Sequence, residues 1–160
     1  GGMNVAPDLN AKLDILSNAV SAMEKLGYKK INIACLAANE KVDSKIPASV
    51  DARDLQNANS QFPNCVIEGP IALDVAISPE AARHKGIKSR ISGDVDLFLV
   101  PNIETGNVLG KALIHYNKAK MAGIILGATN PVVLTSRAET AEGKINSIAM
   151  ACLIGASANV

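Results

Sequence analysis

The sequence predicts an α/β protein with a mostly parallel sheet that helices cover on both faces. Short runs of aliphatic and β-branched residues alternate along the chain with longer segments of helical period, as in successive βαβ units. Hydrophobic residues make up 48% of the 160 residues, which is ample for a core. The three cysteines lie in apolar runs without C-x-x-C spacing, so we expect Cys35, Cys65 and Cys152 to be buried thiols.

The first half of the chain predicts helices and strands in turn. Leucines at helical spacing, followed by Gly27, predict the first helix, and a short β-rich run predicts a buried parallel strand after it. In order, the expected elements are a helix over 8–26, a strand over 31–36, a polar loop over 38–47, a helix over 48–59, and a strand over 65–67 closed by Glu68-Gly69-Pro70. The period of 71–77 is ambiguous, and Ser78-Pro79-Glu80 predicts the start of a short helix that ends at Gly86.

The second half continues the alternation. The clearest strand covers 95–100 and stops at Pro101-Asn102. After it we expect a helix with an apolar face of Leu109, Ala112, Leu113 and Tyr116, strands over 121–126 and 132–134, and a closing buried helix marked by Ala141, Ile145, Ile148, Ala149 and Cys152.

Ser136 and Arg137 lie where the last β-type run stops and a helical pattern begins. In α/β proteins, ligands collect outside the carboxyl ends of parallel strands, and a helix that starts there directs free N–H groups toward an anion. A hydroxyl and a guanidinium at that turn therefore predict an anion site. Ser136-x-x-Glu139 also fits a capping box, in which the two side chains only satisfy the first turn of the helix, and both interpretations remain open.

Composition excludes several classes of function. A formal net charge of +1, with two Tyr, two Phe and no Trp, offers neither a basic surface nor stacking platforms for nucleic acid. The longest apolar stretch, 148–158, is too short to span a bilayer, and the first residues lack a signal pattern, so we expect a cytoplasmic protein without membrane contact. With only His84 and His115, we predict no metal site and no cofactor.

Three loops that follow strands should lie at one edge of the sheet: 68–74, 101–107 and 135–137. Their sequences resemble motifs of the phosphate acetyl/butyryl transferases, which carry Gly-Pro-x-x-x-Asp, Pro-x-x-x-x-Gly-Asn and a closing Ser-Arg in this order. The matching residues are Gly69, Pro70 and Asp74, then Pro101, Gly106 and Asn107, then Ser136 and Arg137, with Asn146 also at the family's place. The segments 84–89 and 134–139 look more similar to the butyryl branch.

The resemblance implies a three-layer α/β/α architecture similar to the isocitrate and isopropylmalate dehydrogenases, with the active site in a cleft. It implies the reaction acyl-CoA + phosphate ⇌ acyl phosphate + CoA, with coenzyme A as a substrate and a homo-oligomeric enzyme. It assigns Ser136 and Arg137 to catalysis. With less weight we place Asn102, Gly106, Asn107 and Asn146 at the cleft wall, although a turn role suits the first three equally well.

The resemblance covers only the second part of the family's chains, which are about twice as long. We therefore expect residues 1–121 to form most of one domain on the CoA side, and 122–160 to belong to another domain whose N-terminal part is absent. Acetyl-branch members carry an acidic thiol base where this chain has Gly143, so Glu139, Glu142, the phosphate or a residue of the absent part must replace it. The alternatives are a CoA-binding or dimerising fragment without turnover, and a relative of the decarboxylating dehydrogenases. Those enzymes bind a divalent metal through clustered aspartates, whereas here Asp94 and Asp96 are the only close pair and Asp96 should point into a strand.

Overall fold

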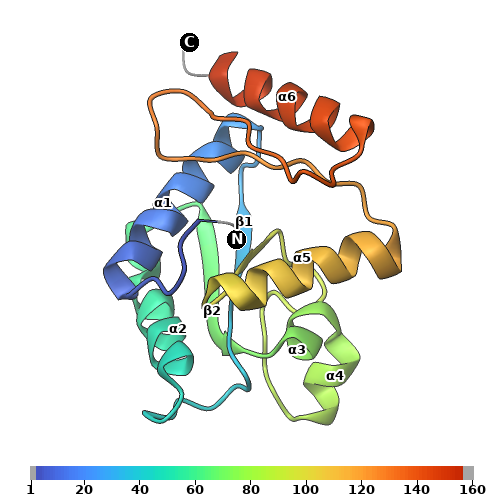
Figure 1. Cartoon of the computed structure of the whole chain (residues 1–160). Helices are drawn as coiled ribbons and strands as arrows, with labels where there is room; N and C mark the ends of the chain where they lie inside the picture. The colour runs from blue at the N-terminus through green and yellow to red at the C-terminus, as the bar shows by residue number, and fades with distance from the viewer. Residues whose placement is uncertain (1–2, 157–160) are drawn as a thin grey trace. The chain divides into compact units, whose positions relative to one another are not determined.

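The computed structural model describes residues 3–156. The chain divides into two compact units, one with the residues up to Leu13 and Lys29–Asn107, the other with Asp14–Tyr28 and the residues from Val108 onward. Helix α1, Leu9–Lys25, and helix α5, Ile103–Asn117, each continue from one unit into the other. Figure 1 shows the order of the elements along the chain. Within residues 3–156, no helix has the length and the apolar content needed to cross a membrane.

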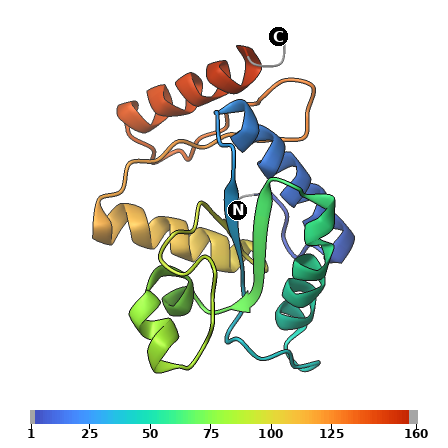
Figure 2. The same ribbon diagram turned by 180° about the vertical axis from the view of Figure 1, so that it is seen from behind.

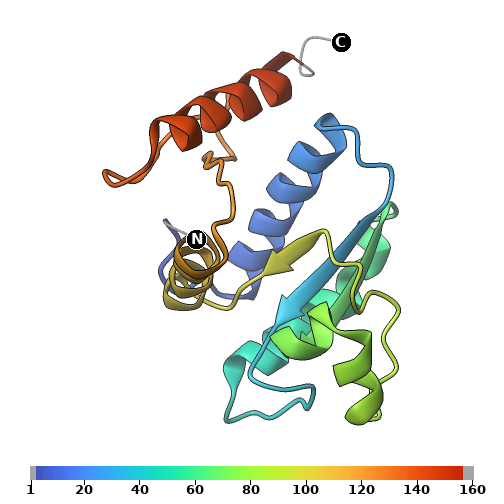
Figure 3. The ribbon, with the colours of Figure 1, turned by 90° about the vertical axis from the view of Figure 1, so that its right-hand side faces the viewer.

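A three-stranded parallel sheet forms the centre of the first unit. Its strands are β1 (Ile31–Leu36), β2 (Cys65–Ile71) and β3 (Leu97–Leu99), in the order β2-β1-β3. Ile33 of β1 pairs with Ile67 on one side and with Leu97 on the other, and Figure 3 shows β1 and β3 running in the same direction. Every residue of β1 is buried, as expected for a central parallel strand. The predicted parallel sheet is confirmed.

Helices of the first unit pack against this sheet. They are α2 (Pro47–Asn57), which continues into the 3₁₀ turn η1 (Ala58–Gln61), and the short helices α3 (Leu73–Ile77) and α4 (Pro79–His84). Figure 2 shows α2 alongside β2, and Ala52 and Leu55 on its inner face are buried. Ser78 caps α4 as predicted, because its side chain accepts a hydrogen bond from the Ala81 N–H at 3.2 Å.

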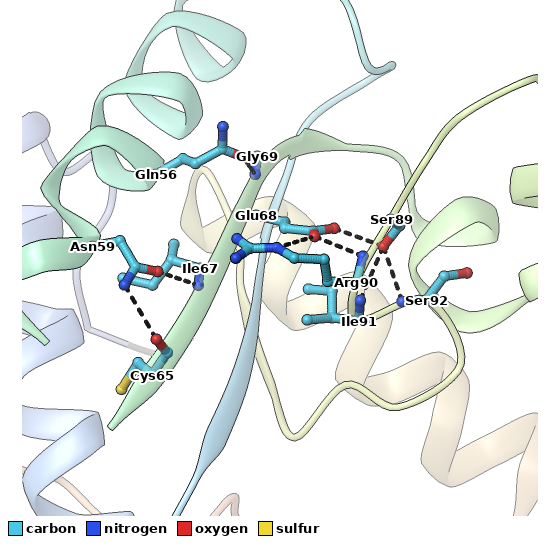
Figure 4. Close-up of polar contacts among 10 residues, drawn as sticks. All are labelled: Gln56, Asn59, Cys65, Ile67, Glu68, Gly69, Ser89, Arg90, Ile91 and Ser92. Atoms are coloured by element: carbon cyan, nitrogen blue, oxygen red, sulfur yellow. Dashed lines mark hydrogen bonds and ion pairs between the residues drawn. The ribbon is translucent and has the colours of Figure 1, made fainter. Parts of the chain in front are cut away.

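The outer edge of β2 is closed by amide side chains instead of another strand (Figure 4). The Gln56 Oε1 accepts a hydrogen bond from the Gly69 N–H at 3.0 Å, and the Asn59 Oδ1 accepts one from the Ile67 N–H at 2.7 Å. The Asn59 Nδ2 donates to the Cys65 carbonyl at 3.2 Å. Because these outward backbone groups are satisfied, the sheet ends at β2.

Glu68, on the same strand, fixes the turn that precedes β3 (Figure 4). Its carboxylate accepts hydrogen bonds from the Ser89 hydroxyl at 2.6 Å, from the Arg90 backbone N–H at 2.7 Å and from the Arg90 Nε at 3.3 Å. The Ser89 Oγ in turn accepts from the N–H groups of Ile91 and Ser92. This network ties the chain after α4 to the edge strand β2.

The expectation that β2 would close at Glu68-Gly69-Pro70 was wrong, because the strand continues to Ile71. The reason is the close approach of its neighbours at Gly69. A Cβ there would lie 2.8 Å from the Cys35 Cβ and 2.9 Å from the Ala52 carbonyl oxygen. Gly69 is therefore a packing requirement inside a strand instead of a stop signal. Strand β3, by contrast, is shorter than expected, because it has three residues where six were expected.

The second unit has helices but no regular sheet among its described residues. Its last helix, α6, covers Ala141–Ala156. The predicted strands over 121–126 and 132–134 were wrong, since their only described ladder is one antiparallel bridge between Ile125 and Val132. The Ile125 N–H donates to the Val132 carbonyl at 2.8 Å and the reverse bond measures 3.2 Å. A longer strand would need a further strand to pair with its remaining backbone N–H and C=O groups.

One face of α6 packs against the extended segment before it, which Figure 1 draws in orange. Gly143, Ser147 and Ile154 are the buried residues of the helix. The Ser147 hydroxyl accepts a hydrogen bond from the Gly123 N–H at 2.9 Å and donates to the Gly143 carbonyl at 2.7 Å. These bonds hold α6 to the segment around Gly123.

The face of α6 that was expected to be buried is instead exposed. Ile145 and Ile148 are 65% and 55% exposed, and the Cys152 thiol on the same face is exposed too, so the expectation for Cys152 was wrong. Cys35 and Cys65 are buried as predicted, and burial raises the pKa of the Cys35 thiol to about 12. Tyr116 on the expected apolar face of α5 is 91% exposed.

Candidate functional site

Ser136 and Arg137 lie in an exposed turn of the second unit, between the extended segment and α6. The Ser136 carbonyl accepts a hydrogen bond from the Glu139 N–H at 3.0 Å, and the Ser136 Oγ accepts one from the Ala138 N–H at 3.3 Å. Both side chains are exposed. The turn therefore presents a hydroxyl and a guanidinium together at the surface.

The capping box predicted for Ser136 and Glu139 is not formed, because α6 begins at Ala141. Thr140 caps the helix instead, as its Oγ1 accepts a hydrogen bond from the Gly143 N–H at 3.0 Å. The Glu139 carboxylate accepts a hydrogen bond from the Thr140 N–H at 3.0 Å. The expectation that the helix starts at Ser136 was wrong, and the hydroxyl of this serine instead accepts a hydrogen bond within the turn, from the Ala138 N–H.

The Arg137 guanidinium makes no hydrogen bond or ion pair with the residues that the structure describes. An arginine held by a neighbouring carboxylate would have its fork of donors occupied, whereas this fork is open to solvent. Planar N–H donors of this kind bind phosphate and carboxylate oxygens in pairs. The geometry therefore offers Arg137 to an external anion.

The residues expected at the cleft wall of the first unit have structural contacts. Asn102 caps α5, since its Oδ1 accepts a hydrogen bond from the Thr105 N–H at 2.9 Å. Gly106 and Asn107 lie inside α5, not in a loop as expected, and the Gly106 N–H donates to the Asn102 carbonyl at 3.2 Å. Because α5 follows β3 directly, Asn102 and the Ala72 turn after β2 both lie at the carboxyl edge of the parallel sheet.

The motif segment around Asp74 also has a local role. Its carboxylate, in the first turn of α3, forms an ion pair with the Lys85 Nζ at 2.9 Å. That hydrogen bond lowers the pKa of Asp74 and raises the pKa of Lys85. Lys85 also lies 3.3 Å from the Glu40 carboxylate, which joins the loop after β1 to α3 and α4. Asp74 and Lys85 are exposed while the Glu40 side chain is mostly buried, and the three charges join the loops at this edge of the sheet.

Asp94 and Asp96, the only close pair of aspartates that the sequence offers to the dehydrogenase alternative, join β1 to the start of β3. The Asn32 N–H donates to the Asp96 Oδ2 at 2.8 Å, and the Asn32 Nδ2 donates to the Asp94 Oδ2 at 3.0 Å. Both carboxylates thus serve the sheet. No observation on this pair favours the dehydrogenase alternative.

Asn146 lies on α6 and is partly buried, and it belongs to the same unit as Ser136 and Arg137. A cavity of about 150 Å³ in this unit is lined by Asn18, Ser21, Lys25 and Thr129 among others, and none of the predicted site residues lines it.

The sequence interpretation missed one contact near the turn. The Glu139 carboxylate occupies the space beside Gly143, so that a Cβ on Gly143 would collide with it. Gly143 was the sequence signal for this contact, because a residue without a side chain leaves that space open to the Glu139 carboxylate.

Comparisons with known proteins agree on one family. The family model described as Phosphate acetyl/butaryl transferase matches residues 1–152. The phosphate butyryltransferase of Clostridium acetobutylicum is 44% identical over 153 residues, which are 94% of this chain and 51% of that protein. The phosphate acetyltransferase of Thermotoga maritima is 40% identical, over 95% of this chain and 52% of its own.

A solved structure supports the same relationship. The branched-chain phosphotransacylase of Enterococcus faecalis superposes with a TM-score of 0.88 at 38% identity, covering 96% of this chain and 55% of that one. The chain thus spans about half the length of the relatives that it matches. The family match over nearly all of the chain, the shared fold and the three motifs in order lead to one conclusion: the chain belongs to the phosphate acetyl/butaryl transferase family.

Proposed function

We propose that this chain is part of an acyltransferase that moves a butyryl or acetyl group between CoA and inorganic phosphate. One observation carries the proposal. In the last of the three motifs shared with the family, both side chains are exposed, and the Arg137 guanidinium makes no hydrogen bond or ion pair with the described residues. In the first motif, by contrast, packing explains Gly69 and an ion pair engages Asp74.

The chemistry of the reaction suits a hydroxyl beside an open guanidinium. A phosphate oxygen attacks the thioester carbonyl carbon, and a tetrahedral intermediate forms with negative charge on its oxygen. The C–S bond then breaks, the acyl phosphate is released, and the CoA thiolate leaves and takes up a proton. Fixed donors stabilise the oxyanion, so we assign the phosphate and the developing charge to Arg137 and a hydrogen bond to the same centre to Ser136.

Glu139 is the carboxylate that best suits the exchange of the thiol proton. Two acidic residues were candidates, Glu139 and Glu142. Glu142 forms an ion pair with the Lys120 Nζ at 2.7 Å, and this contact raises the pKa of Lys120. The Glu139 carboxylate lies over Gly143, where acidic side chains of the acetyl branch would project, and its backbone N–H is bonded to Ser136. We assign to Glu139 the proton that the thiol gains or loses.

A pair of substitutions tests this assignment in an active enzyme. The test protein is a chimera in which this chain replaces the matching half of the C. acetobutylicum phosphate butyryltransferase. Glu139→Ala is expected to lower kcat on the order of 10²-fold or more. Adding Gly143→Asp should restore much of that loss, because it returns a carboxylate to the space that Glu139 vacates.

Two controls separate this role from packing. Gly143→Asp alone should lower the melting temperature, since the new side chain meets the Glu139 carboxylate. Glu142→Ala should leave kcat close to that of the parent chimera. If Glu139→Ala turns over like the parent, or if Glu142→Ala is the slower variant, Glu139 is not the proton carrier.

The remaining features of the proposal follow from the family relationship. We propose that residues 122–160 belong to a domain whose other part this chain lacks, and that 1–121 form most of a CoA-side domain. In that arrangement Asn102, Gly106, Asn107 and Asn146 contribute to the cleft wall of a three-layer enzyme similar to the isocitrate and isopropylmalate dehydrogenases. A cytoplasmic homo-oligomer that works without a metal remains our expectation.

The proposed function is tested with the same chimera. It should release CoA from butyryl-CoA in a reaction that requires phosphate, and the acyl phosphate formed can be trapped with hydroxylamine. A chimera that melts cooperatively, binds CoA by calorimetry and still fails to release CoA would favour the non-catalytic alternative. A chimera that binds no CoA would remove the proposal altogether.

A further inference from the structure

The second unit contains a cavity that the proposed acyl transfer does not use. Its volume is about 150 Å³, and its walls come from the last turns of α1, from the loop over 126–131 and from the buried side of α6. All of these segments belong to the same unit. Neither Ser136 nor Arg137 lines the cavity, so the proposed catalytic turn does not account for it.

Part of the cavity wall is polar. Asn18, Ser21 and Lys25 occupy positions i, i+3 and i+7 of α1, which share one face of the helix. Thr129 lines the cavity from the loop. These side chains offer amide, hydroxyl and ammonium donors. Lys25 carries the only charge among the described residues that line the cavity, so the charge at this wall is positive.

The loop comes close to α1 at Gly127. This glycine has a φ of +96°, and a Cβ on it would lie 3.2 Å from the Asn18 Nδ2. Both the backbone conformation and the close approach favour a residue without a side chain. Gly127 therefore allows the loop to form a wall of the cavity beside the Asn18 amide.

The remaining part of the lining is mostly apolar. Ala22 and Ile154 are 5% and 3% exposed, and Pro131 adds a further apolar side chain. A wall with donors and a positive charge beside a buried apolar wall suits a ligand with one anionic end and one hydrocarbon end. A cavity of about 150 Å³ admits a molecule of about six non-hydrogen atoms, as benzene shows in an engineered cavity of that volume.

We propose that this cavity is a binding site for a short-chain carboxylate. The carboxylate accepts charge-assisted hydrogen bonds from the Lys25 ammonium and further hydrogen bonds from Asn18 and Ser21, and the hydrocarbon tail lies against Ala22 and Ile154. The site goes beyond the proposed acyl transfer and does not rest on it. A bound acid connects the loop to α1 and so stabilises the unit.

Binding is measured on the ¹⁵N-labelled chain by nuclear magnetic resonance. The probes are butyrate, butyramide, which has the same size without the charge, and inorganic phosphate, which has the charge without the tail. Butyrate should shift the backbone signals of Ser21, Gly127 and Thr129 with a Kd on the order of 1 mM. Butyramide and phosphate should each bind about tenfold more weakly or worse, because each lacks one of the two contacts. Sodium chloride at the same ionic strength is the control for salt effects.

Matched variants locate the site. Lys25→Gln should weaken butyrate binding about tenfold or more, because it removes the charge-assisted contact. Lys111→Gln makes the same change at an exposed lysine of α5 in the same unit and should bind butyrate like the parent. Ser21→Leu, at an exposed position, places a bulky side chain in the polar wall and should also prevent binding. A thermal melt of each variant confirms that it is folded.

Arg137→Gln separates this cavity from an anion site at the exposed turn, and it should bind butyrate like the parent. The proposal is overturned by butyrate shifts confined to the residues around Arg137, by equal binding of butyrate to the Lys25→Gln variant and the parent, or by butyramide or phosphate that binds as tightly as butyrate. An absence of shifts at about 100 times the expected Kd would overturn it too. The measurement involves no turnover, so this inference and the proposed function can fail independently.

Discussion

Arg137→Lys in the chimera is expected to lower kcat/KM for butyryl-CoA and phosphate on the order of 10²-fold, comparable to the loss of one oxyanion donor. Lysine keeps the positive charge but replaces the planar fork by a single ammonium group, so paired contacts to phosphate oxygens are lost. A factor of about 100 corresponds to about 2.7 kcal/mol of transition-state stabilisation.

The structure predicts that stability will hardly change. Arg137 is exposed, has no partner among the described residues, and precedes the first residue of α6 by four positions, so the helix dipole does not favour a cation or an anion there. Exposed substitutions without such features stay within about 0.5 kcal/mol. A loss of turnover at an unchanged melting temperature is therefore the expected signature of a substrate contact.

The assay is the release of CoA, followed with a thiol reagent, together with a thermal melt of each variant. Arg53→Lys is the matched control, because Arg53 lies on α2 and its guanidinium contacts the Asp54 carboxylate at 2.9 Å. The control should keep the parent's turnover. An Arg137→Lys variant that melts like the parent and stays within about threefold of its kcat/KM would remove Arg137 from the mechanism, and with it the main chemical support for the proposed function.

Three further outcomes are expected. Thr140→Ala should lower the free energy of unfolding in urea by about 1 kcal/mol because it removes the α6 cap, while Ser136→Ala should change it by less than about 0.5 kcal/mol; equal effects would contradict the cap assignment. EDTA should leave the chimera's activity intact, and a loss that a divalent metal reverses would refute metal independence. The Cys35 thiol has a pKa of about 12 in the folded protein, whereas the thiol of the unfolded chain ionises near 9.0. Unfolding therefore becomes easier as pH rises between these values. Urea titrations across that range should show that the free energy of unfolding falls more steeply with pH for the parent than for Cys35→Ala, by at most about 1.4 kcal/mol per pH unit. Equal slopes would exclude this linkage.

Much of the fold could be predicted from local pattern. The expected helix over 8–26 is α1, Leu9–Lys25, and the expected strand over 31–36 is β1 with the same bounds. In both, the side-chain pattern agrees with the burial in the structure, where Leu16 and Val20 of α1 and every residue of β1 are buried. The Ser78 cap and the stop at Gly86, which has a φ of +68°, were also predictable, because they depend on neighbours in sequence.

Other features depended on neighbours in space. Ser136 and Thr140 are both acceptable caps by residue type, and the helix begins at the second because Ser147 is bonded to Gly123 and Glu139 lies over Gly143. In β2, Gly69 reads locally as a stop, but the closeness of Cys35 and Ala52 makes it part of the strand.

What the sequence by itself determined is the order of helices and strands in the first unit, the parallel sheet and the family, because these follow from periodicity and from motifs that are local in the chain. The tertiary structure decided which side of α6 is covered, and it left Arg137 without a partner among the described residues. The apolar stripe on α6 predicts a buried face, whereas in the structure Ile145 and Ile148 on that face are exposed. Whether that face is buried depends on what packs against it. Burial requires two surfaces in contact, and the periodic pattern of a helix specifies only its own surface.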